Sequence, residues 1–244
     1  QTTPQWTPGT KVGYCGISYG FVIDQLVRRL DAKKRTSAQF FREEIRPLSK
    51  DQDFFIGLPS TENYRVARIS NPSFVQSAVA HLSRPHEYIH ILNNFFSNGM
   101  VAQASASYPE FLDLMRPDFI PYNSPDIREL PIISVMGIGT ARAMAHTLHA
   151  AGKLISMDDK EIMSVPRSYE EDFILSTHKA YGRGFTHIPH PLGESRHIIQ
   201  FIGNGGQTLA WDAEKDIIFV LFRNGLLAGA NKREEMREMV IEAF

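Results

Sequence analysis

The sequence predicts an α+β fold, in which a mainly helical first part is followed by an antiparallel sheet and a final helix. Up to about residue 181, apolar residues recur mostly at helical spacing. From Gly182 onward the pattern changes to short runs of strand type that are separated by turn residues. Helical spacing returns over 232–243, and its apolar residues are predicted to face inward: Met236, Met239, Val240 and Phe244.

Local start and stop signals predict the helices of the first part. The first helix is predicted over Ser18–Leu30, with Ser18 as its N-cap. A second helix begins at Thr36 or Ser37 and stops at Pro47, because a residue before proline disfavours the helical conformation. The other predictions are helices over much of 71–130, including one that ends at 98–99, helices over 140–151 and 156–163, and extended pieces over 54–58 and 63–69.

Four strands are predicted in the second part, over 183–188, 197–202, 208–212 and 217–222. The last two are joined by a connection of hairpin length. The strand at 217–222 is apolar on both faces, which is typical of a strand in the middle of a sheet. We therefore predict one domain over 1–244, mainly helical to about 181 and built from a sheet and a terminal helix over about 182–244.

Composition excludes several classes of protein. The net charge of −1 predicts no nucleic-acid partner through bulk electrostatics. The single cysteine, Cys15, excludes an intrachain disulfide framework and a cysteine-rich zinc site. No apolar run has the length of a transmembrane segment. None of these features specifies a cellular compartment.

A tyrosine stands just before the first predicted helix. The run Pro-Gly-Thr-Lys-Val-Gly-Tyr ends at Tyr14 and is followed by small residues and Tyr19. This pattern resembles the second motif of the serine β-lactamase and penicillin-binding-protein superfamily, and is most similar to its class C-like and esterase branch. Further segments keep the order of that family, so the resemblance covers nearly all of the chain: 39–48, 54–59, 137–142 and 203–206.

The resemblance implies a β-lactamase/transpeptidase-like fold and hydrolysis of an ester, amide or lactam through an acyl-enzyme, with no cofactor. It implies that Tyr14 is the general base. It also implies that Asn204, Gly205 and Gly206 form the substrate-side motif. Two positions depart from the family pattern: Asn204 replaces a lysine or histidine, and Gly16 replaces an asparagine.

The family's nucleophile lies in a Ser-x-x-Lys motif that precedes the tyrosine. Residues 1–13 contain no serine, and we interpret the match at Ser176-Thr177-His178-Lys179 as chance. We therefore expect this chain to be the C-terminal two-thirds or so of the domain, with little hydrolysis of a small-molecule or peptide ester or amide by itself. The strand 217–222 would then pair with a preceding segment or self-associate.

Three alternatives compete with this interpretation. Residues 16–20 match G-x-S-x-G, the nucleophile elbow of α/β-hydrolases, with Ser18 as nucleophile and a late histidine as partner. A metal site at His187 and His190, with His178 and His197 nearby, is disfavoured because no H-E-x-x-H motif accompanies them, and we predict surface-loop histidines instead. The third alternative is a catalytically dead binding or scaffold protein of the same fold.

Overall fold

The computed structural model describes residues 6–83, 120–174 and 177–227, together with Pro4, Ile89 and Val240. Within these residues the α-helices are α1 (Ser18–Leu30), α2 (Ser37–Phe40), α3 (Phe74–Ser83), α6 (Pro125–Arg128), α7 (Ala141–Gly152) and α8 (Met157–Ser164). The strands are β1 (Phe54–Ile56), β2 (Gly137–Gly139), β3 (Ser168–Asp172), β4 (Thr177–Gly182), β5 (Phe185–His190), β6 (Gly193–Ile202), β7 (Thr208–Asp212) and β8 (Ile217–Leu221). Most of the predicted helix that ends at 98–99 and of the predicted helix at 232–243 lies outside the described residues.

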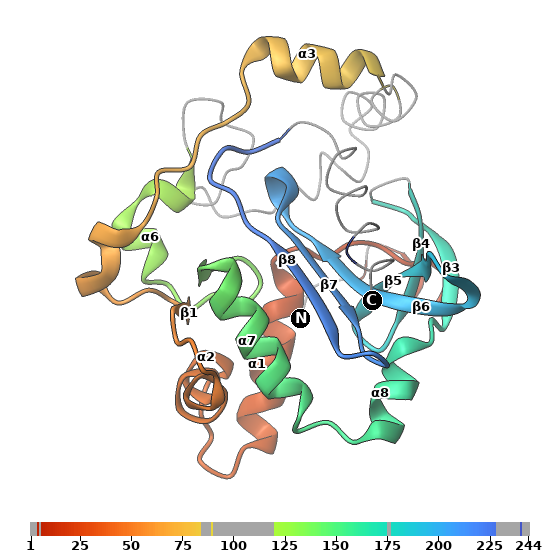
Figure 1. The fold of residues 1–244 in the computed structure, drawn as a ribbon, viewed down its shortest axis with the longest axis horizontal. Coiled ribbons are helices and arrows are strands. Elements are labelled where there is room, and N and C mark those ends of the chain that lie inside the picture. The colour runs from red at the N-terminus through yellow and green to blue at the C-terminus, as the bar shows by residue number, and fades with distance from the viewer. Residues whose placement is uncertain are drawn as a thin grey trace.

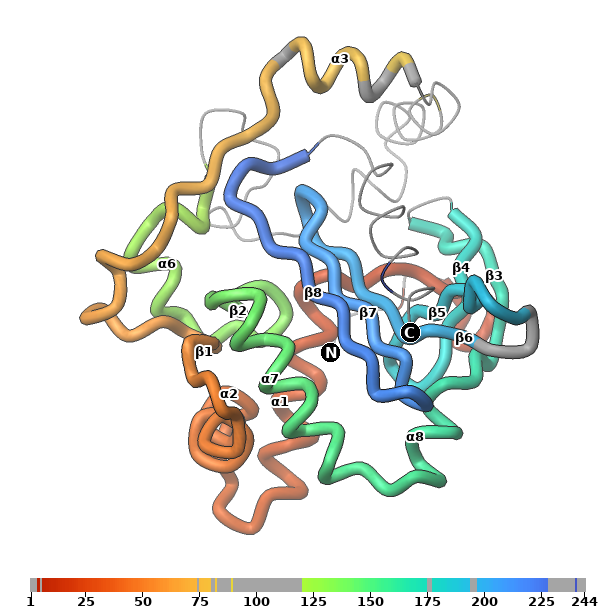
Figure 2. Tube along the Cα trace, in the orientation of Figure 1, coloured from red at the N-terminus to blue at the C-terminus, as the bar shows by residue number. Residues whose placement is uncertain are grey.

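The main sheet has six antiparallel strands in the order β3-β4-β5-β6-β7-β8 (Figure 1). Each strand pairs with the next one along the chain, so the sheet is a meander. Strands β1 and β2 form a separate pair beside α7 (Figure 2). Helix α3 extends away from the sheet (Figure 1). The predicted α+β order, a mainly helical part followed by an antiparallel sheet, is confirmed.

Each face of the sheet has its own apolar cluster. Ile198 and Ala210 pack together on one face, whereas Ile199 and Trp211 lie on the other. This division follows from the strand period of two, which sends successive side chains to opposite faces. The Trp211 face is covered by α7 and α8. Gly152 at the end of α7 permits this close approach, because a Cβ there would lie 3.1 Å from the Trp211 ring.

Two strands were not predicted from the sequence, since the main sheet begins at Ser168 rather than near residue 182. Strand β3 is the edge strand of the sheet, and its middle residues are exposed: Tyr169, Glu170 and Glu171. Without a buried face in that stretch, the strand lacks the alternation of apolar and polar residues on which the prediction depends.

The predicted strand over 63–69 is wrong. A 3₁₀ helix occupies Ser60–Arg65, and an irregular stretch follows it. The backbone of Ile69 instead forms two hydrogen bonds with the side chain of Asn123. This side chain accepts from the Ile69 N–H and donates to the Ile69 carbonyl, each at 2.8 Å. Ser70 then forms an isolated parallel bridge with Gly225.

Helix α1 has the predicted bounds but not the predicted cap. Ile17 occupies the N-cap position and no side chain caps the helix, so Ser18 is the first helical residue instead. The helix turns Gly20 inward, where Ser134 leaves no room for a Cβ. Its apolar stripe is largely exposed, with Phe21 at 54%, Val22 at 59% and Leu30 at 84% exposure.

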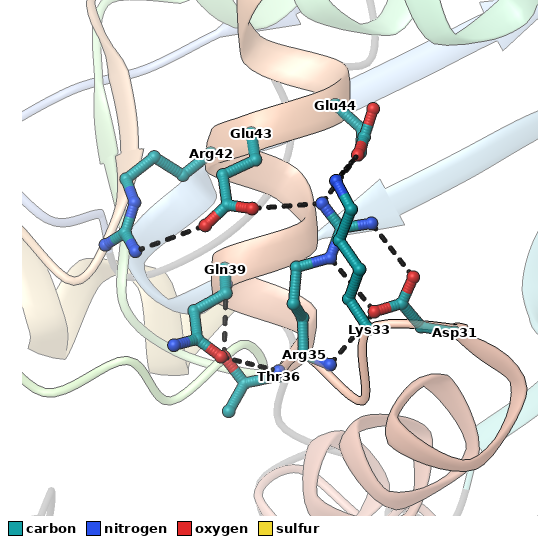
Figure 3. Close-up of polar contacts among 8 residues, drawn as sticks. All are labelled: Asp31, Lys33, Arg35, Thr36, Gln39, Arg42, Glu43 and Glu44. Carbon is teal, nitrogen blue, oxygen red and sulfur yellow. Dashed lines mark hydrogen bonds and ion pairs between the residues drawn. The ribbon is translucent and has the colours of Figure 1, made fainter.

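Arg35 ties the end of α1 to the helix that follows (Figure 3). Its guanidinium donates to both carboxylate oxygens of Asp31 at 2.9 Å, and also to Glu43 and Glu44. The side chains of Arg35 and Asp31 are only 10% and 8% exposed. The hydrogen bonds from Arg35 hold the pKa of Asp31 well below its usual range and also lower that of Glu44.

Other predicted helix starts are confirmed by their caps. Thr36 and Gln39 form a reciprocal capping box at α2. Thr140 accepts from the Ala143 N–H at the start of α7, and Ser156 accepts from the Asp159 N–H at the start of α8. These signals are local, which is why the sequence alone was sufficient to predict them.

Candidate active site around Tyr14

Tyr14 lies in the segment that leads into α1. Its side chain is 44% exposed, and its backbone N–H donates to Asp172 Oδ1 at 3.3 Å. Two residues earlier, Val12 forms a parallel bridge with Asp172 and accepts from the Phe173 N–H at 2.8 Å. The backbone before α1 is therefore attached to the end of β3, while the tyrosine side chain keeps access to solvent.

Side chains from the segment before α1 pack against the corner that follows β3. Lys11 Nζ lies 3.6 Å from the centre of the Phe173 ring, and Trp6 meets the same ring edge-on. A Cβ on Gly13 would lie 2.7 Å from the Trp6 ring and 3.0 Å from Ile174. Glycine at position 13 is what allows the segment to pass between these two side chains.

Asp172 is fully buried and accepts several hydrogen bonds. Besides the Tyr14 N–H, it accepts from the Ile174 N–H at 2.9 Å and from the Tyr181 hydroxyl at 2.6 Å. Burial and the bond to Asp172 raise the pKa of Tyr181 far above its usual value. Burial lowers the pKa of Lys179 on the same strand, and the charge of Asp172 partly opposes this.

Asp172 and Tyr181 were not predicted as site residues. Asp172 ends an acidic, exposed strand, and its contact with Tyr14 joins residues that are 158 positions apart. No short motif links them, so the sequence alone carried no signal for the contact.

Asn204, Gly205 and Gly206 form the turn between β6 and β7. Gly205 and Gly206 have φ of 72° and 94°, values that favour glycine. A Cβ on Gly205 would lie 2.3 Å from Leu226 Cδ2, and the Gly205 carbonyl accepts from the Leu227 N–H at 2.9 Å. The close approach that Gly205 permits is therefore made by residues 226–227 of the chain itself.

The nucleophile elbow at Ser18 is contradicted by the fold. That motif needs a parallel strand that runs into a sharp turn before the helix. The six-stranded sheet is antiparallel, and among the described residues before Ser18 only Val12 takes part in a β-bridge. Ser18 is exposed at the first turn of α1. The other serine considered, Ser176, lies outside the described residues.

The prediction that His187 and His190 are surface-loop residues is wrong, because both are buried in β5. The His187 Nε2 lies 2.8 Å from the Met163 carbonyl. The His190 Nδ1 accepts from the Leu192 N–H, so its Nε2 carries the proton and donates to buried Asp212 at 3.1 Å. Within the described part of the chain, no group of three or more His, Cys, Asp or Glu is arranged to hold a metal.

None of the described helices has the length and apolar character needed to cross a membrane.

The helical body and the antiparallel meander define a fold of the β-lactamase and penicillin-binding-protein class. The family model described as Beta-lactamase matches residues 1–241, and the chain belongs to that family. A search of curated proteins gives no match.

Three solved structures are similar to the chain. EstA from Arthrobacter nitroguajacolicus Rue61a has a TM-score of 0.73 at 21% identity, and the match covers 100% of this chain and 63% of that one. A family VIII carboxylesterase has a TM-score of 0.70 at 18% identity, covering 99% and 61%. A penicillin-binding-protein homolog from Caulobacter crescentus has a TM-score of 0.62 at 22% identity, covering 92% and 56%. The chain thus spans about three fifths of the length of these proteins.

Proposed function

We propose that this chain supplies the general base and the sheet of a serine hydrolase site that cleaves esters or related acyl compounds through an acyl-enzyme. The observation that carries the proposal is Tyr14, exposed directly before α1 with its backbone held by a buried carboxylate. The match to the Beta-lactamase family model supports it. The names of two of the similar structures, an EstA and a carboxylesterase, favour ester substrates.

In the proposed reaction the Tyr14 phenolate takes the proton of a serine hydroxyl, and the serine oxygen bonds to the substrate carbonyl carbon. The bond to the alcohol breaks, and the alcohol leaves with that proton. Water then cleaves the acyl-serine by the same route in reverse. The reaction requires no cofactor.

Tyr14 needs a partner for this role. A free tyrosine has a pKa of about 10 and is a poor base near neutrality, whereas a nearby ammonium group favours the phenolate. Within these 244 residues no serine precedes Tyr14, and the chain spans only part of the proteins it resembles. We therefore propose that a Ser-x-x-Lys segment from outside these 244 residues completes the site, and that these residues alone hydrolyse little.

Labelling with a fluorophosphonate probe tests the proposal. In the natural protein, Tyr14→Phe is expected to slow labelling by two to four orders of magnitude, the usual contribution of general base catalysis. Ser18→Ala is the matched control and is expected to label at the wild-type rate. If Tyr14→Phe labels normally, Tyr14 is not the base, and loss of labelling in Ser18→Ala would return Ser18 as the nucleophile.

A second candidate is a binding protein of the same fold that has lost catalysis. Asn204 favours it, because an uncharged side chain at the family's cationic position cannot help to stabilise a phenolate. Leu226 also favours it, because it occupies the space beside Gly205. A natural protein that contains Ser-x-x-Lys, binds a β-lactam reversibly and forms no covalent adduct would support this candidate.

The outer edge of β8 is the proposed place for a partner strand. In the described sheet, β8 pairs with β7 on one side and is the last strand in the order. A strand edge with free backbone groups promotes association. We expect the 244-residue protein to self-associate through 217–222, and Val220→Lys to reduce this. Analytical ultracentrifugation that finds a stable monomer at micromolar concentration would contradict the expectation.

A further inference from the structure

We propose that Asp172 is the positioning residue for Tyr14, and that the Tyr181 hydroxyl occupies the second oxygen of this carboxylate. This inference rests on the proposed function, since it assigns how the general base is held. It concerns residues of β3 and β4, which lie far from Tyr14 in the sequence.

The first step of the argument is the geometry of the carboxylate. Asp172 Oδ1 accepts from the N–H groups of Tyr14 and Ile174, and Oδ2 accepts from the Tyr181 hydroxyl. Its exposure is 0%. A buried carboxylate is stable only when donors satisfy it, so the charge of Asp172 and the position of the Tyr14 backbone depend on each other.

The second step concerns the surroundings of that contact. Phe173 lies between Lys11 and Trp6, and Gly13 passes between Trp6 and Ile174. The residues that follow Asp172 and those that precede Tyr14 are thus packed against one another. A shift of Asp172 would be transmitted to the Tyr14 backbone rather than absorbed by a loose loop.

The third step compares the two phenols. Tyr181 is half-buried and donates to Asp172, and the proximity of Tyr14 raises the pKa of Tyr181 further. Tyr14 is 44% exposed. The charge of Asp172 acts on both Tyr181 and Lys179 of β4 and raises the pKa of each. Tyr181 therefore stays protonated as a donor to the carboxylate, whereas the bond from Tyr14 to Asp172 comes from its backbone.

The role of Asp172 is geometric. A negative charge opposes the ionisation of a nearby phenol, so Asp172 does not activate Tyr14 as a base. Its bond is to the Tyr14 backbone, and it touches no reacting atom. Asp172 therefore does not supply the cation that favours the phenolate.

The test uses the 244-residue protein with ¹³Cζ-labelled tyrosine, followed by NMR during a pH titration. Tyr14→Phe and Tyr181→Phe assign the two signals. In Asp172→Asn, which keeps the shape but not the charge, we expect the pKa of Tyr181 to fall by about one unit or more. In Asp172→Ala, the amide protons of Tyr14 and Ile174 should exchange at least about tenfold faster, while those of β7 stay protected.

Glu171→Gln is the matched control, since Glu171 is the exposed neighbour of Asp172 on β3. It should change neither titration nor exchange. The proposal is overturned if Asp172→Ala leaves the exchange of the Tyr14 amide proton unchanged, or if Asp172→Asn leaves the titration of Tyr181 unchanged. If Asp172→Ala does not fold, the titration of Tyr181 in Asp172→Asn still tests the proposal. Normal fluorophosphonate labelling of Tyr14→Phe in the natural protein, with the NMR results as expected, would refute the proposed function and leave the positioning role intact.

Discussion

The segment that carries Tyr14 and the turn that carries Asn204 are held in place by different means. Side chains hold the first: Asp172 binds its backbone, and Trp6 and Lys11 pack on Phe173. Glycine conformation holds the second, since Gly205 and Gly206 both have positive φ and Leu226 packs against Gly205. The first arrangement leaves a phenol exposed, whereas the second needs its glycines to form the turn itself. Glycines in a family motif are thus weaker support for a substrate site than a fixed, exposed tyrosine.

The largest expected effect is at the turn. Gly205→Ala combines a strained φ of 72° with a clash against Leu226. We expect it to lower the free energy of unfolding by roughly 2–4 kcal/mol. Chemical denaturation measures this.

Gly193→Ala is the control for that variant, because a Cβ there meets nothing within 4 Å. It should change stability by about 0.5 kcal/mol or less. Combining Gly205→Ala with Leu226→Ala should show coupling between the two positions, since they are in contact. If Gly205→Ala is as stable as Gly193→Ala, the packing account of the turn is wrong.

The next largest effect on stability is expected at Tyr181, which binds the same carboxylate as the Tyr14 backbone. Tyr181→Phe removes the hydroxyl that donates to buried Asp172 at 2.6 Å. We expect a loss of about 1–3 kcal/mol, the cost of leaving a buried acceptor without its donor. Thermal and urea denaturation would report it. Tyr169→Phe, at a residue that is 72% exposed on β3, should have little effect, and equal losses in both variants would argue against a special role for Tyr181.

Low pH tests the ion pairs that Arg35 forms after the end of α1. Arg35 depresses the pKa of Asp31 and Glu44 in the folded state. Their contribution to stability is therefore complete above the unfolded pKa values of about 4, and is lost as pH falls below them. Urea denaturation between neutral pH and pH 2.5 should show a steeper loss for the wild type than for Arg35→Gln. Arg42→Gln, at an exposed arginine 3.9 Å from Glu43, should retain the wild-type slope.

The smallest stability effect is expected at Asn204 itself. Its side chain is exposed in the turn, so Asn204→Ala should change the free energy of unfolding by about 0.5 kcal/mol or less. If Asn204 also orients a substrate carbonyl, the same variant should raise KM in hydrolysis by the complete protein. A normal KM would show that Asn204 does not orient the substrate, in contrast to the catalytic role proposed for Tyr14.

Features set by neighbouring residues were predictable from the sequence. The caps at Thr36, Thr140 and Ser156 each join residues three apart, and all three helices start where the sequence predicts. The fold class followed from the change of period near Gly182. Tyr14 was identified as a candidate because its motif is contiguous.

Features set by distant residues were not predictable. His190 is buried because it pairs with Asp212, 22 positions away, and no local pattern marks it as a core residue. Asp172 and Tyr181 became visible only when the sheet brought β3 and β4 beside the N-terminal segment. Ser18 looked like a cap by residue type, but Ile17 takes that position.

The most direct test of the central claim is mass spectrometry of the natural protein, purified from its source and treated with a fluorophosphonate. The account predicts a chain heavier than 27.6 kDa, with the adduct on the serine of a Ser-x-x-Lys motif that precedes Tyr14. A natural chain that begins at Gln1, or an adduct on Ser18, would contradict it.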